Sequence, residues 1–170
     1  MTEERSRTRN RRLIEKTITV PGNLRQACDE FNTRRYFECH EILEEVWQEE
    51  DGALREFYKG LIQLAAAFVH ISRGNFVGAD RLLRTSLGYL GQYRAKGALG
   101  FDVEALCSAA EDCHQRIRML GTGAILEFDL AAAPVWRFDG SALPDDARRW
   151  GAWGFAPDGS ALEMTISVVE

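Results

Sequence analysis

The sequence predicts a mainly α-helical protein: a compact bundle of about five helices with a small β and irregular extension at the C-terminus. Three observations lead to this fold class. Apolar residues recur at helical spacing between residues 24 and 120, short Gly, Asn and Asp turns divide that region, and the pattern changes to alternation after Gly121. A chain of 170 residues with 45% hydrophobic content is large enough for one core of ordinary size, so we expect a single bundle.

Charge and hydropathy argue against two classes of partner. The formal net charge is -5 at pH 7, so the whole protein should not be attracted to nucleic acid or to an anionic membrane. The longest apolar run, from Leu61 to Ile71, is interrupted by Gln63 and His70 and is too short to span a bilayer. We therefore expect no membrane association and no nucleic-acid partner.

Cysteine usage and the N-terminal residues indicate a cytoplasmic protein. No two cysteines form a CxxC pair, and the basic N-terminal residues are not followed by the apolar core of a signal peptide. Thiols of proteins in a reducing compartment stay unpaired. We expect reduced thiols at Cys28, Cys39, Cys107 and Cys113.

Three regions are expected along the chain. They are a flexible arm at residues 1–20, a helical bundle domain at residues 21–121, and a strand and Trp-rich extension at residues 122–170. Within the arm, residues 1–12 alternate Arg with polar residues, and nothing there can be buried. An Arg-rich arm can contact phosphate, but a solvated tail is the preferred interpretation.

Apolar spacing and turn signals predict five helices. They cover residues 24–31, 35–50, 53–72, 76–93 and 103–120. At the turn before the fourth helix, Gly74 supplies a left-handed C-cap and Asn75 an N-cap, and Asp102 caps the fifth helix.

A weak internal repeat with a period of 40 residues pairs two helical hairpins. Residues 31–43 align with residues 71–83. The alignment pairs three core positions: Tyr36 with Phe76, Cys39 with Ala79, and Leu43 with Leu83. The second copy resembles the turn of a tetratricopeptide repeat, in which an aromatic residue fills the gap between two antiparallel helices. The expected architecture is two stacked hairpins plus a fifth helix.

The C-terminal extension shows the alternation of short strands. Leu126, Phe128 and Leu130 alternate with acidic residues, and a second alternating stretch runs from Leu162 to Val168. Aromatic residues, Pro and Gly fill the interval between them. We expect a small antiparallel sheet that packs on the bundle or meets a second copy of the chain, because a lone hairpin is marginally stable.

The second predicted helix carries the candidate site. At 100° per residue, Phe37, His40, Glu44 and Trp47 share one face. His40 and Glu44 are four residues apart, which suits two metal ligands or a coupled acid–base pair. If the second and third helices are antiparallel neighbours, these side chains converge with Gln63 and His70.

Three interpretations of this cluster remain open. In a metal-dependent enzyme, His40, Glu44 and His70 would hold a divalent ion and Glu41 would act as general base. Neither the zinc-protease spacing HExxH nor the Glu-x-x-His spacing of di-iron bundles is met. Alternatively, a buried His pairs with a carboxylate and rigidifies the core, which is the preferred interpretation. The third interpretation is a small-molecule pocket lined by Trp47, Gln63, Tyr58 and Lys59.

The motifs resemble a known family. The strings FN-x4-FECHEILEEVW, FYKGLIQLAAAFVH and RGNFVGADRLL are similar to the family catalogued as domain of unknown function 309, over residues 24–101. The resemblance implies a small all-helical protein and implies no activity. The family motif maps onto these residues: His40, Glu41, Glu44, Trp47, Gly60, Gln63, His70, Gly74 and Asn75.

We expect a binding or interaction module that forms a homodimer through apolar helix faces and the Trp-rich tail. The rival expectation is a metal-dependent, hydrolase-like enzyme. The small-molecule ligand is not identified by the sequence, and a divalent metal is the one cofactor that the residue types suggest.

Overall fold

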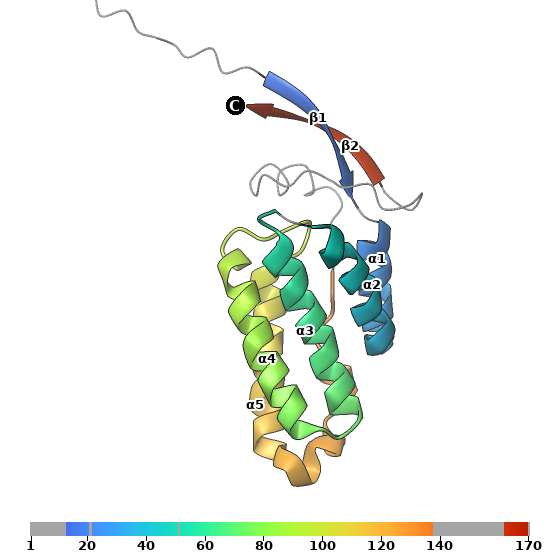
Figure 1. The fold of residues 1–170 in the computed structure, drawn as a ribbon. Helices are drawn as coiled ribbons and strands as arrows, with labels where there is room; N and C mark the ends of the chain where they lie inside the picture. The colour runs from blue at the N-terminus through green and yellow to red at the C-terminus, as the bar shows by residue number, and fades with distance from the viewer. Residues whose placement is uncertain (1–12, 21, 51, 138–161, 170) are drawn as a thin grey trace, which may run out of the picture.

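The computed structural model describes residues 13–20, 22–50, 52–137 and 162–169. Within these residues, five α-helices stand side by side, and each packs against the next along the chain (Figure 1). They are α1 (Gly22–Asn32), α2 (Tyr36–Glu49), α3 (Arg55–Ser72), α4 (Phe76–Leu90) and α5 (Val103–Ala124). The predicted helical bundle is confirmed, with helix ends within a few residues of those expected.

The core lies between the helices and is rich in aromatic rings. Phe31 of α1, Tyr36 of α2 and Phe68 of α3 contact one another, with ring centroids 5.0 to 5.4 Å apart. Each of these rings is almost fully buried, so one aromatic cluster holds the three helices together.

None of the helices in the described part of the chain is long and apolar enough to cross a lipid bilayer.

The two hairpins α1–α2 and α3–α4 have the same turn. Arg34 and Gly74 occupy the left-handed region with φ of 66° and 75°. Four backbone hydrogen bonds recur at an offset of 40 residues, each between 2.8 and 3.1 Å. In the first turn, the amides of Thr33, Arg34, Arg35 and Cys39 donate to the carbonyls of Asp29, Phe31, Glu30 and Arg35, in that order. In the second turn, the amides of Arg73, Gly74, Asn75 and Ala79 donate to the carbonyls of Val69, Ile71, His70 and Asn75, in that order. The predicted repeat is confirmed, and all the paired core positions except Phe76 are fully or almost fully buried.

Close helix approach holds the second hairpin together. A Cβ added at Gly60 of α3 would lie 2.7 Å from the Leu90 side chain, so only glycine fits at this crossing. Beside it, the Ser86 hydroxyl of α4 donates a 2.8 Å hydrogen bond to the Gly60 carbonyl. After α4 the chain makes one 3-10 turn, η1 (Gly91–Tyr93), before α5.

The end of α5 differs from the prediction. Gly121 interrupts the helix with φ 66° and ψ -168°, and the expected strand at Leu126–Leu130 is wrong. Two 3-10 turns, η2 (Ile125–Glu127) and η3 (Leu130–Ala132), occupy this stretch. The carboxylate of Asp129 accepts a 2.9 Å hydrogen bond from the Ala131 amide, which stabilises a turn instead of an extended chain.

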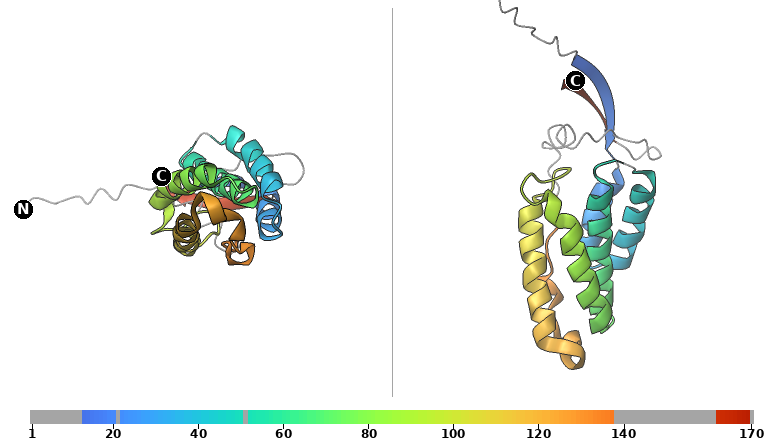
Figure 2. Two further views of the ribbon diagram at one scale, coloured as in Figure 1. Left: turned by 90° about the horizontal axis from the view of Figure 1, so that it is seen from below. Right: turned by 60° about the vertical axis from the view of Figure 1, so that its left-hand side comes forward.

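Two strands lie beyond the end of the bundle at which α1 begins (Figures 1 and 2). β1 (Leu13–Val20) pairs antiparallel with β2 (Leu162–Val169), from Leu13 opposite Val169 to Val20 opposite Leu162. The predicted C-terminal strand is confirmed, but its partner comes from residues 13–20, which were expected to be part of the flexible arm. Residues 1–12 and the aromatic stretch at 138–161 lie outside the described residues.

Candidate functional site

The predicted face of α2 is formed. The His40 Nε2 atom lies 3.2 Å from the Glu44 Oε1 atom, as the spacing of four residues on one helix requires. The Phe37 ring stacks on the imidazole with centroids 6.0 Å apart and is 47% exposed. The Glu44 side chain is 46% exposed, so this pair lies at the rim of the bundle rather than in the core.

The other imidazole nitrogen of His40 is buried. Its Nδ1 atom has no hydrogen-bond partner within the part of the chain that the structure describes. A carboxylate oxygen only accepts, so the contact with Glu44 favours a proton on Nε2. In the neutral ring, Nδ1 is then an acceptor that lacks a donor.

Trp47 extends the same face one turn further along α2. Its indole Nε1 donor is buried and has no partner among the described residues. The Arg55 guanidinium lies 4.1 Å from the ring centroid and donates to the backbone carbonyls of Trp47 and Glu50, at 3.1 and 2.7 Å. Arg55 thereby closes the α2–α3 turn and covers the indole. The sequence patterns did not single out Arg55; its position just after the Asp-Gly turn is the signal that was available.

Gln63 is the residue of the predicted cluster on α3. Its Oε1 acceptor is also buried without a partner in the described residues. The antiparallel pairing sets its height, because Tyr36 packs against Phe68, with ring centroids 5.4 Å apart. Four residues further along α2 is His40, and four residues back along the antiparallel α3 is Leu64, so these two residues lie at the same height along the bundle axis. Gln63 precedes Leu64, and its height therefore differs from that of His40 by about one residue rise, ~1.5 Å.

The remaining pocket residues lie elsewhere. Tyr58, expected to line a ligand pocket, is instead a core residue with 1% exposure, and burial raises the pKa of its phenol. Lys59 reaches toward α4, where its Nζ atom lies 5.0 Å from the centroid of the Tyr89 ring. Glu41, expected as a general base, is exposed on α2.

His70 is engaged in the α3–α4 turn. Its Nδ1 atom lies 3.0 Å from the Asn75 side-chain nitrogen, and the Asn75 side-chain oxygen Oδ1 accepts from the Gly78 amide at 3.1 Å. Burial lowers the pKa of His70, and the nearby cations of Arg73 and Arg81 lower it further. The imidazole therefore acts as a neutral acceptor that orients the N-cap of α4.

The three expected metal ligands are not brought together. Among the residues that the structure describes, no three His, Cys, Asp or Glu side chains are grouped so that they could hold a metal ion. His40 and Glu44 form a pair, whereas His70 is committed to Asn75. The shared metal site of His40, Glu44 and His70 stays a prediction, beside the observed His40–Glu44 pair and the contact of His70 with Asn75.

A second His–carboxylate contact links α4 to α5. The His114 Nε2 atom lies 2.7 Å from the Asp80 Oδ1 atom, and Arg84 donates to the other oxygen at 2.9 Å. The hydrogen bond from His114 lowers the pKa of Asp80, and the charge of Arg84 adds to this effect.

All four cysteines are buried and form no disulfide, and the thiol of Cys113 donates to the Ala132 carbonyl at 3.3 Å.

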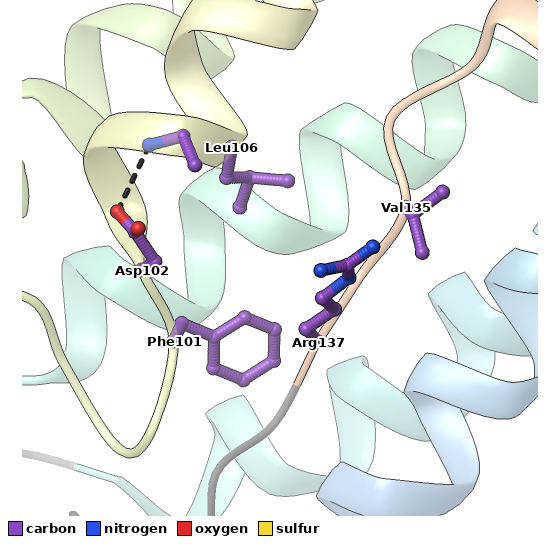
Figure 3. Close-up of a pocket in the computed structure, with 6 residues that line it drawn as sticks. Phe101, Asp102, Leu106, Val135 and Arg137 are labelled. Carbon is purple, nitrogen blue, oxygen red and sulfur yellow. Dashed lines mark hydrogen bonds between the residues drawn. The ribbon is translucent and has the colours of Figure 1, made fainter.

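Two surface cavities open away from the predicted site. One of about 330 Å³ lies at the end of α5 and is lined by Arg116, Met119, Leu120, Glu127, Phe128 and Asp129. The other, of about 250 Å³, lies at the start of α5 (Figure 3) and is lined by Phe101, Asp102, Ala105, Leu106, Val135 and Arg137. Neither His40 nor Gln63 lines either of these two cavities.

The fold and the site define a small helical-hairpin protein with a His–Glu pair on its second helix. Residues 24–82 match the model of the family described as Domain of unknown function (DUF309), so the resemblance expected from the motifs is confirmed over this segment. The match covers α1, α2, α3 and the first part of α4, which are the helices that build the site.

A curated relative supports the same grouping. The uncharacterized protein YpuF of Bacillus subtilis (strain 168) is 42% identical over 87 residues. That stretch is 50% of this chain and 50% of the relative, so the chain spans about half the length of the curated relative that it matches. No solved structure matches the chain.

Proposed function

We propose that this protein is a binding module whose ligand lies on the α2–α3 face. One observation carries the proposal: His40 Nδ1, Trp47 Nε1 and Gln63 Oε1 are buried without partners in the described structure. A buried polar atom left unpaired costs about 1–3 kcal/mol, so nearly all such atoms in native proteins have a partner. Three such atoms on two neighbouring helices, at positions that the sequence motif also singles out, support a site that a ligand completes.

The chemistry of the three atoms restricts the ligand. Trp47 Nε1 is a donor only, Gln63 Oε1 is an acceptor, and His40 Nδ1 is an acceptor in the neutral ring. A complementary ligand therefore offers at least two N–H or O–H donors and one acceptor, as an amide or a short peptide does. His40 and Trp47 are seven residues apart on α2, which corresponds to about 10 Å, so a ligand that reaches both is about as long as a dipeptide.

The rim of the site adds charge and apolar surface. The Glu44 carboxylate and the Phe37 ring are about half exposed beside His40, while Arg55 covers the indole of Trp47. A ligand that carries a positive charge near His40 would gain from the Glu44 carboxylate, although an exposed ion pair contributes only about 0–1 kcal/mol. Specificity should therefore come mainly from the buried polar atoms.

Titration with Gly-Gly amide, followed by the indole N–H signals in NMR spectra, tests the proposal. The Trp47 signal is identified by its loss in Trp47→Phe. We expect this signal to shift in a saturable manner in the wild type, and the response to weaken at least tenfold in Gln63→Met. The matched control is Gln48→Met, because Gln48 is an exposed glutamine on α2. A Trp47 signal that does not respond, or responds equally in Gln63→Met, contradicts the proposal.

A metal-dependent hydrolase is the second candidate. Its supporting observation is the 3.2 Å approach of His40 and Glu44, which gives two ligand atoms on one helix face. The remaining ligands would have to come from outside the group of residues that the structure describes. Metal analysis of untagged protein decides between the candidates: one bound metal ion per chain, lost in His40→Ala, would favour the hydrolase.

We also propose that the protein is a cytoplasmic homodimer. The four unpaired, buried cysteines are consistent with a reducing compartment. Light scattering across a range of protein concentrations measures the oligomeric state. A mass that stays at one chain at every concentration would contradict the dimer.

A further inference from the structure

A short segment of the chain closes the bundle in place of a sixth helix. We call residues 130–137 the strap. The strap begins with η3, turns back along α5, and lies between α5 and α1 (Figure 3). The strap thus occupies the groove between the first and the last helix.

One aromatic side chain anchors the strap. The Trp136 indole is 2% exposed and stacks on Phe31 of α1 with centroids 4.2 Å apart. The Phe101 ring also contacts this indole in a T-shaped arrangement, with centroids 6.3 Å apart. A fully buried indole between two rings is the largest single contribution that the strap makes to packing.

The rest of the contact is made to the main chain of the strap. The Asn32 carboxamide donates to the Trp136 carbonyl and accepts from the Trp136 amide, both at 2.8 Å. On the opposite side, the Cys113 thiol donates to the Ala132 carbonyl. Grooves that bind extended peptides use the same two kinds of contact. Polar groups of the groove pair with the peptide backbone, and a pocket receives one anchor side chain.

The strap does not fill its groove completely. The Nε1 donor of Trp136 is buried without a partner in the described structure. The 250 Å³ cavity lies between Val135 and Arg137 of the strap and Phe101 and Leu106 at the start of α5 (Figure 3). These defects lower the free-energy cost of releasing the strap relative to a segment packed at core density.

A glycine break connects the strap to the bundle. Gly121 has φ 66° and ψ -168°, and a Cβ added at Gly121 or Gly123 would meet no atom within 4 Å. Such a segment can take up large changes of backbone angle, as a hinge must. Ile125 and Phe128 lie between this break and the strap and are buried against the bundle, so rotation at Gly121 would exchange them together with the strap.

We propose that two copies of this chain exchange their straps, so that each Trp136 docks on the Phe31 and Asn32 of the other copy. The occupant is a second copy because its strap has the sequence that the groove already binds. Exchange keeps every groove contact and adds only the cost of association and of the hinge change. β2 lies downstream of the strap and would pair with β1 of the copy that receives the strap.

Complementation between two full-length variants tests the exchange. Asn32→Ala weakens the groove and Trp136→Ala weakens the strap. In an exchanged heterodimer, the intact groove of the second variant receives the intact strap of the first. One variant is labelled with 15N, the two are unfolded and refolded together, and native mass spectrometry counts each species.

We expect heterodimers about tenfold more abundant than the homodimers of either variant. The Asn32 carboxamide and the Trp136 indole hold the same strap residue, so losing both in one contact should cost less than losing one in each of two contacts. Wild-type chains refolded together at the same concentration should form mixed-isotope dimers. Circular dichroism checks that each variant folds, and Trp136→Phe replaces Trp136→Ala if it does not. Only monomers in the wild type, or heterodimers at the statistical proportion, would overturn the proposal. The exchange is independent of the ligand site on α2 and α3.

Discussion

Arg34 and Gly74, forty residues apart, hold the same left-handed backbone position in two successive turns, with φ of 66° and 75°. The backbone hydrogen bonds around them match pair for pair. The two hairpins are therefore one structural unit used twice, with a residue suited to the conformation in only one copy. Glycine adopts a positive φ without strain, whereas a residue with a Cβ is strained there by about 1–2 kcal/mol.

The first prediction exchanges the residue types of these turns. Arg34→Gly should raise the free energy of unfolding by about 0.5–1 kcal/mol, since relief of strain outweighs the added entropy of the unfolded chain. Gly74→Ala should lower it by at least ~1 kcal/mol, because the new Cβ would also lie 3.1 Å from the Leu126 side chain. Urea unfolding measures both, and a change of the same sign in the two variants would refute the shared turn.

The second prediction compares two glycines of α4. A Cβ at Gly78 would lie 2.8 Å from His70 Nδ1 and 2.9 Å from the Asn75 side-chain nitrogen, whereas one at Gly88 would meet nothing within 4 Å. Gly88→Ala should therefore stabilise the protein by up to about 1 kcal/mol through helix propensity. Gly78→Ala should destabilise it, because the His70–Asn75 pair must move. Thermal unfolding of both variants is the measurement, and equal stabilisation would show that this pair is not confined by Gly78.

The third prediction concerns pH. Burial and the cations of Arg73 and Arg81 lower the pKa of His70 in the folded protein, so the unfolded chain takes up this proton first as the pH falls. The contribution of His70 is fully present above its ordinary pKa of about 6.5 and is lost as the pH falls from there through the folded-state pKa.

His70→Gln isolates this effect, because a glutamine oxygen can still accept from Asn75. The wild type should lose more stability than the variant between pH 7 and the acid side of this window. Chemical unfolding at several pH values measures the difference. A wild-type stability that falls relative to that of His70→Gln as the pH rises would have the wrong sign for a neutral acceptor.

Local signals account for the parts of the fold that the sequence predicts. The two hairpins follow from helical spacing, from the Gly74–Asn75 turn and from the repeat, which all act over a few residues. The strap and the strand pair depend on contacts across the whole chain, such as Asn32 with Trp136, 104 residues apart. No periodic pattern reports such a contact, so the alternation at Leu126, Phe128 and Leu130 was interpreted as a strand.

The site was predictable in part for the same reason. His40, Glu44 and Trp47 share a face because helix geometry fixes it. The partner of His70 is set by the turn five residues further on, which competes with any convergence toward His40. The Arg55 contact with Trp47 depends on how closely the α2–α3 turn folds back, and neither helical pattern contains that information.

The stability of Gln63→Met tests the central claim most directly. Methionine has nearly the size and helix propensity of glutamine but carries no strong acceptor. If Gln63 Oε1 is kept unpaired for a ligand, the variant should be more stable than the free wild type by about 1 kcal/mol, or about 2–4 °C in Tm for a chain of this size. Gln48→Met should change stability by less than about 0.5 kcal/mol. A loss of about 1 kcal/mol or more in Gln63→Met would show that Gln63 already has a partner in the free protein, and would contradict a ligand site on α2 and α3.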